Sequence, residues 1–84
     1  MSYSVDWTAD ALAALTAVWI HSSNRRSVAL AQASLDQILS ADPFGRGKAV
    51  SEGLFAIEIH PLRVQFEVSE IERIVTVVSV RQLP

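Results

Sequence analysis

The chain has 84 residues, of which 50% are hydrophobic and 19% are charged, a balance that excludes an intrinsically disordered protein. The absence of cysteine excludes a disulfide scaffold, a thiolate zinc site and a cysteine nucleophile. The net charge of −2 lacks the basic excess typical of a domain that binds nucleic acid by itself. No apolar run reaches the ~20 residues of a membrane span. We therefore expect residues 1–84 to form one cytoplasmic domain without a metal or cofactor.

The first half of the chain predicts a strand followed by two helices. Tyr3, Val5 and Trp7 alternate with polar residues, which is typical of a half-buried strand. A helix is expected over residues 9–22, capped by Thr8, and a second one over residues 25–40, capped by Ser23 or Asn24. The apolar stripe expected on the first helix is Leu12, Leu15 and Trp19, flanked by Ala11 and Val18. The stripe expected on the second is Val28, Ala31, Leu35, Ile38 and Leu39. The short link between the helices predicts an antiparallel hairpin.

The second half of the chain predicts a loop and then strands. Asp42-Pro43 ends the second helix, because the residue before a proline is disfavoured in the α conformation. Residues 43–53 read as a loop that holds a short edge strand near Ala49–Ser51. The apolar period then changes to two, which predicts the strands Leu54–Ile59, Leu62–Val68 and Arg73–Val80.

The apolar faces of these strands predict their registers. Pairing Glu58 with Arg63 keeps the apolar residues of both strands on one face. In the last hairpin, pairing Val68 with Ile74 places Arg63 opposite Ser79. The face that the helices cover is then expected to carry Phe55, Ile57, Val64, Phe66 and Val78. The open face is expected to carry Glu58, Arg63, Gln65, Glu67, Val75, Val77, Ser79 and Arg81.

The order of these elements predicts an α+β fold. An N-terminal strand and a helical hairpin pack on a twisted, mainly antiparallel sheet, in the order β-α-α-β-β-β with one further short strand. The first strand is expected to pair with a later one, because an isolated short strand has no partner.

Four segments in this order resemble a known family. They are Tyr3–Leu12, the break Asp42-Pro43 followed by Gly45, the segment Pro61–Val68 and the segment Arg73–Val80. Together they resemble the RelE/ParE superfamily, the toxin half of bacterial type II toxin–antitoxin pairs, also called plasmid stabilisation proteins. The resemblance covers almost the whole chain and is more specific for the fold than for the activity.

The resemblance implies a toxin that inhibits growth and a protein partner. RelE-like members cleave mRNA on the ribosome as metal-independent endoribonucleases, in which a 2′-hydroxyl attacks its own phosphate. ParE-like members inhibit DNA gyrase. In both branches a cognate antitoxin wraps the toxin. The alternative is a non-catalytic, protein-binding member of the fold, a decayed or solitary toxin homologue.

Five residues are candidates for the site. By the resemblance, Arg63 sits where RelE-like toxins carry an active-site arginine, and Arg81 lies near the position of a second one. Arg46 and Lys48 lie in the region of the family's catalytic lysines, at a different spacing. His60 is a candidate acid or base, because histidine titrates near neutral pH.

The sequence leaves the role of these residues open. Arg63 opposite Glu58 is either a cross-strand ion pair or a phosphate contact held in place by that carboxylate. No histidine or tyrosine follows Arg81, in contrast to the best-known RelE-like toxins. mRNA cleavage and gyrase inhibition therefore both remain candidates.

The mean hydropathy of +0.29 is high for so small a domain. It predicts an apolar surface that another chain covers. The candidate contacts are Val75 and Val77 on the open face, and Ile20 and Leu30 on the helical hairpin. The expected occupant is either a second copy of the chain, forming a homodimer, or the antitoxin.

Overall fold

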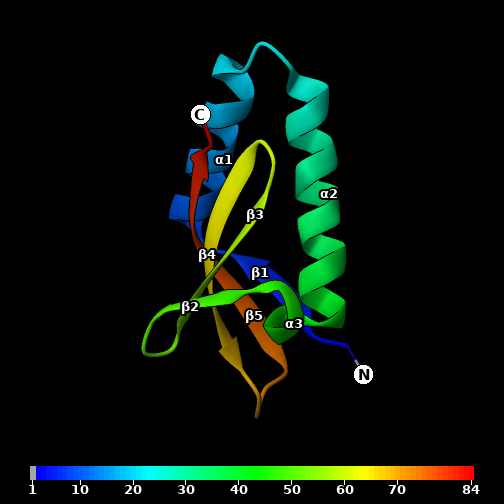
Figure 1. The fold of residues 1–84 in the computed structure, drawn as a ribbon, viewed down its shortest axis with the longest axis vertical. Helices are drawn as coiled ribbons and strands as arrows, with labels where there is room; N and C mark the ends of the chain where they lie inside the picture. Colours follow the sequence, from blue (N-terminus) through cyan, green and yellow to red (C-terminus); the bar gives the residue numbers. More distant parts are fainter. Residues whose placement is uncertain (1) are drawn as a thin grey trace.

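The structure, a computed structural model, describes residues 2–84 and combines two long helices with a five-stranded sheet (Figure 1). The elements are β1 (Ser4–Trp7), α1 (Ala9–His21), α2 (Arg25–Ala41), α3 (Pro43–Arg46), β2 (Lys48–Ser51), β3 (Leu54–Ile59), β4 (Leu62–Ser69) and β5 (Ile74–Gln82). This order confirms the predicted α+β fold with its further short strand, β2. The sequence pattern does not predict α3, a single turn that Asp42 caps by accepting a hydrogen bond from the Gly45 amide at 3.0 Å.

The predicted side-chain caps begin both long helices. The Thr8 hydroxyl accepts a hydrogen bond from the Ala11 amide at 3.0 Å. The Asn24 side chain accepts one from the Ser27 amide at 3.1 Å. Each cap satisfies a backbone donor that has no partner within its helix, so the local sequence fixes both helix starts.

Arg25 joins the two helices across their short link. A cation is unfavourable in the first turn of a helix, and Arg25 is the first residue of α2. Its guanidinium, however, donates to the carbonyl oxygens of Trp19 at 3.2 Å and Ile20 at 3.1 Å. These carbonyls belong to the last turn of α1, where the helix dipole favours a positive charge. The arginine therefore provides hydrogen-bond donors and a positive charge to the C-terminal end of α1.

The buried side of α1 differs from the predicted stripe. Ala11 and Leu15 are buried, whereas Leu12 is 46% exposed and Trp19 is 42% exposed. The prediction for Leu12 and Trp19 is wrong because α1 carries apolar residues around most of its circumference, so the spacing alone does not select one face. The α2 stripe is confirmed: Val28, Ala31, Leu35 and Leu39 are buried, and Ile38 packs against the core.

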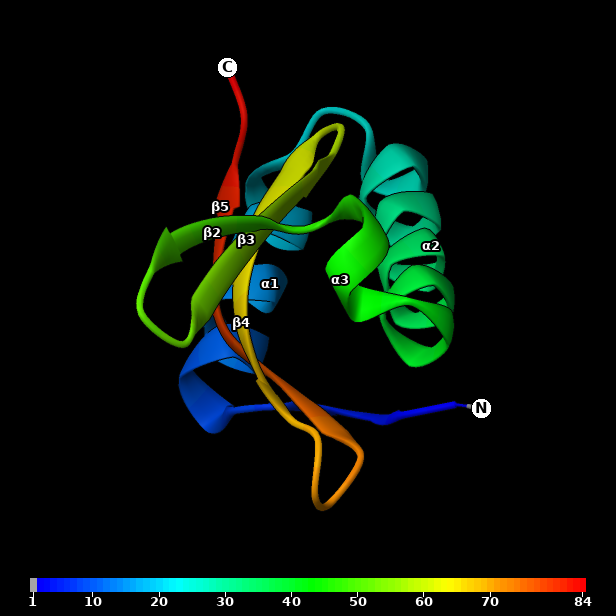
Figure 2. The ribbon, with the colours of Figure 1, turned by 60° about the horizontal axis from the view of Figure 1, so that its bottom comes forward.

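The sheet has the strand order β1-β5-β4-β3-β2. β1 runs parallel to β5, and all other neighbours are antiparallel. α1 contacts β5, and α2 contacts β1, β3 and β4. Figure 2 shows β2 and β3 on the near side of the molecule and α1 on the far side. The helices therefore leave one face of the sheet open.

The β3–β4 register is the predicted one. Glu58 pairs with Arg63, Ile57 with Val64 and Phe55 with Phe66. The turn between the strands is His60-Pro61, whose peptide bond is cis. The apolar residues of both strands therefore lie on the covered face, as expected.

The predicted β4–β5 register is wrong for two local reasons. Arg73 has a φ of 58° and belongs to the turn, so β5 begins at Ile74, which pairs with Ser69 instead of Val68. A β-bulge then shifts the pairing again between Gln65 and Phe66, which leaves Val78 as the extra residue of β5. As a result, Arg63 lies opposite Arg81 instead of Ser79.

This register changes what β5 contributes to each face. Val75 and Val77 are fully buried in the core, so their predicted place on the open face is wrong. Val78, predicted in the core, is partly exposed. Because the bulge reverses the alternation after Val77, Ser79 and Arg81 still reach the open face as predicted.

Phe66 is the largest fully buried side chain of the core. Its ring stacks on Phe55 with 5.8 Å between the centroids. The chain crosses it at Gly47, where a Cβ atom would lie only 2.7 Å from the Phe66 ring. Glycine therefore allows the chain to pass from α3 into β2 directly over the core.

Polar contacts attach β1 to the distant parts of the chain. The Tyr3 hydroxyl donates to Glu70 Oε1 at 2.6 Å and accepts a hydrogen bond from Arg73 Nη1 at 3.2 Å. The Trp7 indole nitrogen donates to Asp36 Oδ1 at 2.9 Å. β1 is therefore held at both of its ends, by the β4–β5 turn and by α2.

The first prediction tests the core. Phe66→Ala removes a fully buried ring and should lower the free energy of unfolding by about 3–5 kcal/mol, a large part of the roughly 5–15 kcal/mol of a small domain. Ile71→Ala is the control, because Ile71 is 96% exposed and should change stability by less than about 0.5 kcal/mol. Urea unfolding measures both, and equal midpoints would contradict the core assignment.

The second prediction concerns Tyr3, the single tyrosine of the chain. The hydrogen bond to Glu70, followed by desolvation, raises the pKa of the Tyr3 hydroxyl. The neutral Tyr3 hydroxyl therefore stabilises the folded state fully below the ordinary tyrosine pKa of about 10. This contribution is lost as pH rises through the higher pKa of the folded state. Titration of tyrosinate absorbance should give a lower pKa for Glu70→Gln than for the unmodified chain, with Glu72→Gln as the control. An unchanged pKa in Glu70→Gln would contradict the contact.

Candidate functional site

The open face of the sheet is centred on Arg63, which lies in the middle strand of the sheet. Arg63 Nη1 lies 2.9 Å from Glu58 Oε2 on β3, and the Arg63 and Glu58 side chains are 27% and 50% exposed. An exposed pair of this kind contributes roughly 0–1 kcal/mol. The ion pair therefore fixes the direction of the guanidinium more than it stabilises the fold.

Two hollows meet at Arg63. The first has a volume of about 550 Å³ and is lined by Arg46, Lys48, Ala49, Val50, Ala56, Ile57, Glu58 and Arg63. The second has a volume of about 360 Å³ and is lined by Arg63, Gln65, Ser79, Val80 and Arg81. Arg63 is the residue that both hollows share, so a ligand in either one lies beside it.

Arg81 is the direct cross-strand neighbour of Arg63. Like charges directly opposite each other destabilise a sheet. Arg63 turns toward Glu58, whereas within residues 2–84 no ion pair involves Arg81, which is exposed. The pair therefore leaves an uncompensated positive charge on the wall of the second hollow, suited to an anion.

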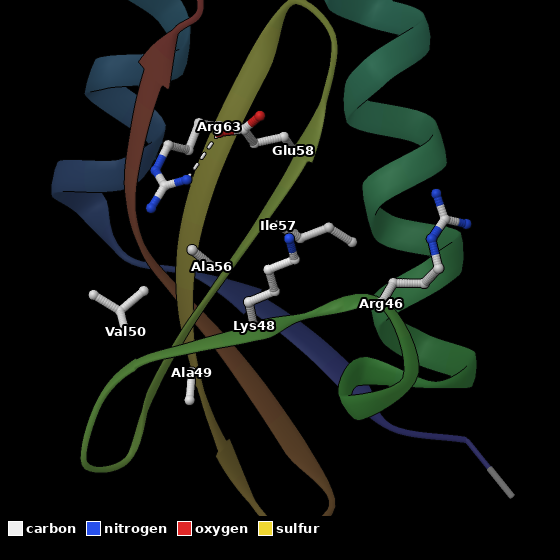
Figure 3. A pocket seen from close by; sticks show the side chains of 8 residues that line it. All are labelled: Arg46, Lys48, Ala49, Val50, Ala56, Ile57, Glu58 and Arg63. Carbon is white, nitrogen blue, oxygen red and sulfur yellow. Dashed lines mark hydrogen bonds and ion pairs between the residues drawn. The ribbon is translucent and has the colours of Figure 1, made fainter.

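Arg46 and Lys48 reach the first hollow from its other side. Arg46 is the last residue of α3 and Lys48 the first of β2, so the turn capped by Asp42 positions both. Figure 3 shows them on the β2 side of the hollow, with the Arg63–Glu58 ion pair across from them. The structure thus brings four of the five predicted site residues around two adjoining hollows.

His60 lies apart from the other four. It is exposed in the β3–β4 turn and lines neither hollow. The turn keeps its place because the Leu83 amide donates to the Pro61 carbonyl at 2.8 Å. His60 therefore sits beyond the end of the open face.

Gln65 and Ser79 are lining residues that the sequence does not single out as a site. The Ser79 hydroxyl donates to Gln65 Oε1 at 3.0 Å on the floor of the second hollow. They face each other because the bulge restores their alternation. The one sequence feature that indicates them is spacing: Gln65 is two residues from Arg63 and Ser79 is two residues from Arg81, so each pair lies on one face of its strand.

Residues 2–84 contain neither a cluster of metal ligands nor a membrane-spanning helix. No group of three or more His, Asp and Glu side chains in this range could hold a metal ion. No helix in the same range is long and apolar enough to cross a membrane.

Comparison with known proteins gives matches at the level of structure. No family model matches the chain, and no curated protein matches it. The toxin–antitoxin complex RelBE2 from Mycobacterium tuberculosis contains a chain with 19% identity and a TM-score of 0.77, and the match covers 98% of this chain and 99% of that one.

Two other solved structures are similar over the same extent. The chromosomal ParDE system from P. aeruginosa has 17% identity and a TM-score of 0.67, covering 98% of this chain and 97% of that one. The archaeal RelE–RelB complex from Pyrococcus horikoshii has 16% identity and a TM-score of 0.67, covering 98% and 96%. The chain therefore has the RelE/ParE fold, as its sequence resemblance predicts.

The third prediction tests the Glu58–Arg63 ion pair. Glu58→Gln removes the charge that competes for Arg63, so inorganic phosphate should bind the open face several-fold more tightly. Glu67→Gln is the control, because Glu67 is an exposed carboxylate of β4 that lines neither hollow. Isothermal titration with phosphate measures both variants. An affinity in Glu58→Gln no higher than in Glu67→Gln would show that the ion pair does not mask an anion site.

Proposed function

We propose that this chain, which has the RelE/ParE fold, is the toxin of a toxin–antitoxin pair and inhibits growth by cutting mRNA on the ribosome. The observation that carries the proposal is the cross-strand pair of Arg63 and Arg81. Their like charges repel each other, and a bound anion would relieve this repulsion. A phosphodiester supplies that negative charge, and arginine is well suited to bind it. The similar structures are toxin–antitoxin systems, which supports the assignment and a cognate antitoxin as partner.

The proposed reaction uses fixed positive charge to stabilise the reacting phosphate. The 2′-oxygen of the RNA forms a bond to the adjacent phosphorus, and the bond from phosphorus to the 5′-oxygen breaks. The products are a 2′,3′-cyclic phosphate and a free 5′-hydroxyl. Arg63 positions the phosphate, because it lies in mid-strand between both hollows. Arg81 stabilises the charge that develops on the phosphate oxygens.

Two proton transfers complete this reaction. The 2′-hydroxyl loses a proton and the leaving 5′-oxygen gains one. Glu58 is the one carboxylate among the residues that line the hollows, so it is the group that accepts the proton of the 2′-hydroxyl. Lys48, in the same hollow, donates a proton to the leaving 5′-oxygen. Arg46 adds positive charge from α3. His60 receives no role, because it lies outside both hollows.

Gyrase inhibition is the second candidate. It is favoured by the similarity to a ParDE system at a TM-score of 0.67. It is also compatible with the net charge of −2, since binding a protein target requires no basic excess. In that case the arginine pair of the open face would have no catalytic role.

The fourth prediction separates these functions. Arg63→Ala and Arg81→Ala should each reduce mRNA cleavage by about 100–1,000-fold, the usual effect of removing one charged stabilising donor. Neither residue belongs to the core, so both variants should stay folded. Arg26→Ala is the matched control, because Arg26 is an exposed arginine of α2. Growth arrest after induction and mapped cleavage of a reporter mRNA measure the effect.

The outcomes point to different functions. The nuclease is supported if the unmodified chain and Arg26→Ala arrest growth and cut the mRNA, whereas Arg63→Ala and Arg81→Ala do neither. Equal arrest by all variants with intact mRNA contradicts it and directs the next measurement to DNA supercoiling by gyrase. Growth unaffected by every variant, including the unmodified chain, would instead indicate the non-catalytic, protein-binding alternative.

A further inference from the structure

The outer side of α1 is an apolar surface that the fold does not cover. Between Ala11 and His21 every exposed residue of α1 is uncharged. Leu12, Trp19 and Ile20 are 46%, 42% and 51% exposed. The one hydroxyl among them, Thr16 Oγ1, already donates to the Leu12 carbonyl at 2.9 Å. The ring of Trp19 has the Arg25 guanidinium 4.6 Å from its centroid, so one side of this residue is already covered by α2. A helix that is apolar on nearly all sides is normally buried.

The residues of this surface form a central line with two flanks. Ala9, Ala13, Thr16 and Ile20 follow one another at spacings of four, three and four residues, the pattern of a helix-packing seam. Leu12 and Trp19, about two turns apart, lie on one flank of the seam. Asp10 and His21, about three turns apart, lie on the other flank. The small side chains of Ala9 and Ala13 allow another helix to approach closely.

This arrangement is complementary to itself in one orientation. When two identical helices pack antiparallel around a two-fold axis, each flank meets the same flank of its partner. An axis near Thr16 places Leu12 of one copy against Trp19 of the other. The same axis places Asp10 against His21. A parallel arrangement would instead put the apolar flank against the charged one.

We propose that α1 forms the interface of a homodimer in which it packs antiparallel against α1 of a second copy. Charge complementarity selects a second copy as the occupant, because the acidic start and the basic end of one helix match those of an identical, reversed helix. The antiparallel arrangement also sets the opposite ends of the two helix dipoles side by side. α1 has 13 residues and is thus about 20 Å long, so the interface belongs to the small, weaker class.

The dimer leaves the open face of the sheet accessible. α1 packs on the covered side of β5, and none of its residues lines either hollow. The inference is therefore independent of the proposed nuclease function, and its test requires no activity. In Figure 2, α1 lies behind the sheet, whose strands β2 and β3 are on the near side.

Sedimentation equilibrium of the purified chain tests the proposal. We expect a concentration-dependent dimer. Thr16→Lys should raise its dissociation constant by about tenfold or more, which corresponds to at least about 1.4 kcal/mol, because a residue next to the two-fold axis meets its own copy. Lysine is a better helix former than threonine, so α1 should remain intact. Leu30→Lys is the control, because Leu30, the other exposed contact expected from the sequence, lies on α2 and outside this seam. If α1 alone forms the interface, this variant should dimerise like the unmodified chain.

Charge reversal and cross-linking test the geometry directly. Asp10→Lys should weaken the dimer, and the double variant Asp10→Lys, His21→Asp should restore it. Because the chain has no cysteine, Thr16→Cys provides a single thiol that should oxidise to a covalent dimer, whereas Leu30→Cys should not. Facing residues of closely packed helices lie within the Cα separation that a disulfide needs.

Three results would overturn the proposal. One is a chain that sediments as a monomer at every concentration. This includes the case in which a co-expressed antitoxin binds α1 but a second copy does not. Another is a Thr16→Lys variant that dimerises as tightly as the unmodified chain. The third is equal cross-linking of Thr16→Cys and Leu30→Cys, which would show that α1 does not face its own copy.

Discussion

β5 is paired on both sides, with β4 and with β1, and its one extra residue determines what each face of the sheet carries. Up to Val77 its alternate valines point into the core. After Val78 the alternation is reversed, so that Ser79 and Arg81 point to the open face while Val80 is buried. The same strand thus supplies the core against α1 and the second arginine of the site. Bulges commonly redirect a side chain in this way next to functional sites.

The β3–β4 hairpin could be predicted from the sequence, and the β4–β5 hairpin could not, for a physical reason. In the first, polar and apolar residues alternate on both strands, so only one register keeps the apolar sets together. In the second, Ile74, Val75, Val77 and Val78 place apolar side chains on both faces, so either parity buries a similar area. The positive φ of Arg73 then decides the register, and nothing in an arginine side chain signals this conformation.

The helices and the site show the same limit. The α2 stripe is predictable because its other sides are polar, whereas α1 is apolar nearly all round and its orientation depends on packing against β5. For the site, the parity of Arg63 and Arg81 is readable from the sequence, but their direct pairing is not, because it depends on the bulge. Arg46 and Lys48 reach the first hollow only through α3, a turn whose Pro43 is buried and whose following residue, Gly47, packs against Phe66.

The parallel pairing of β1 with β5 has a consequence for the order in which the molecule forms during synthesis. Ser4 to Trp7 lie beside Ile74 to Val77, so β1 has no partner strand until β5, the last of the five, has been made. Contacts so distant along the chain form late, because the long loop between them must close before they gain any stabilisation. The helical hairpin also depends on the sheet, because α1 contacts β5 more extensively than it contacts α2. Arg81 arrives only with β5, so a nascent chain that stops after the central strand β4 carries Arg63 but lacks the arginine pair.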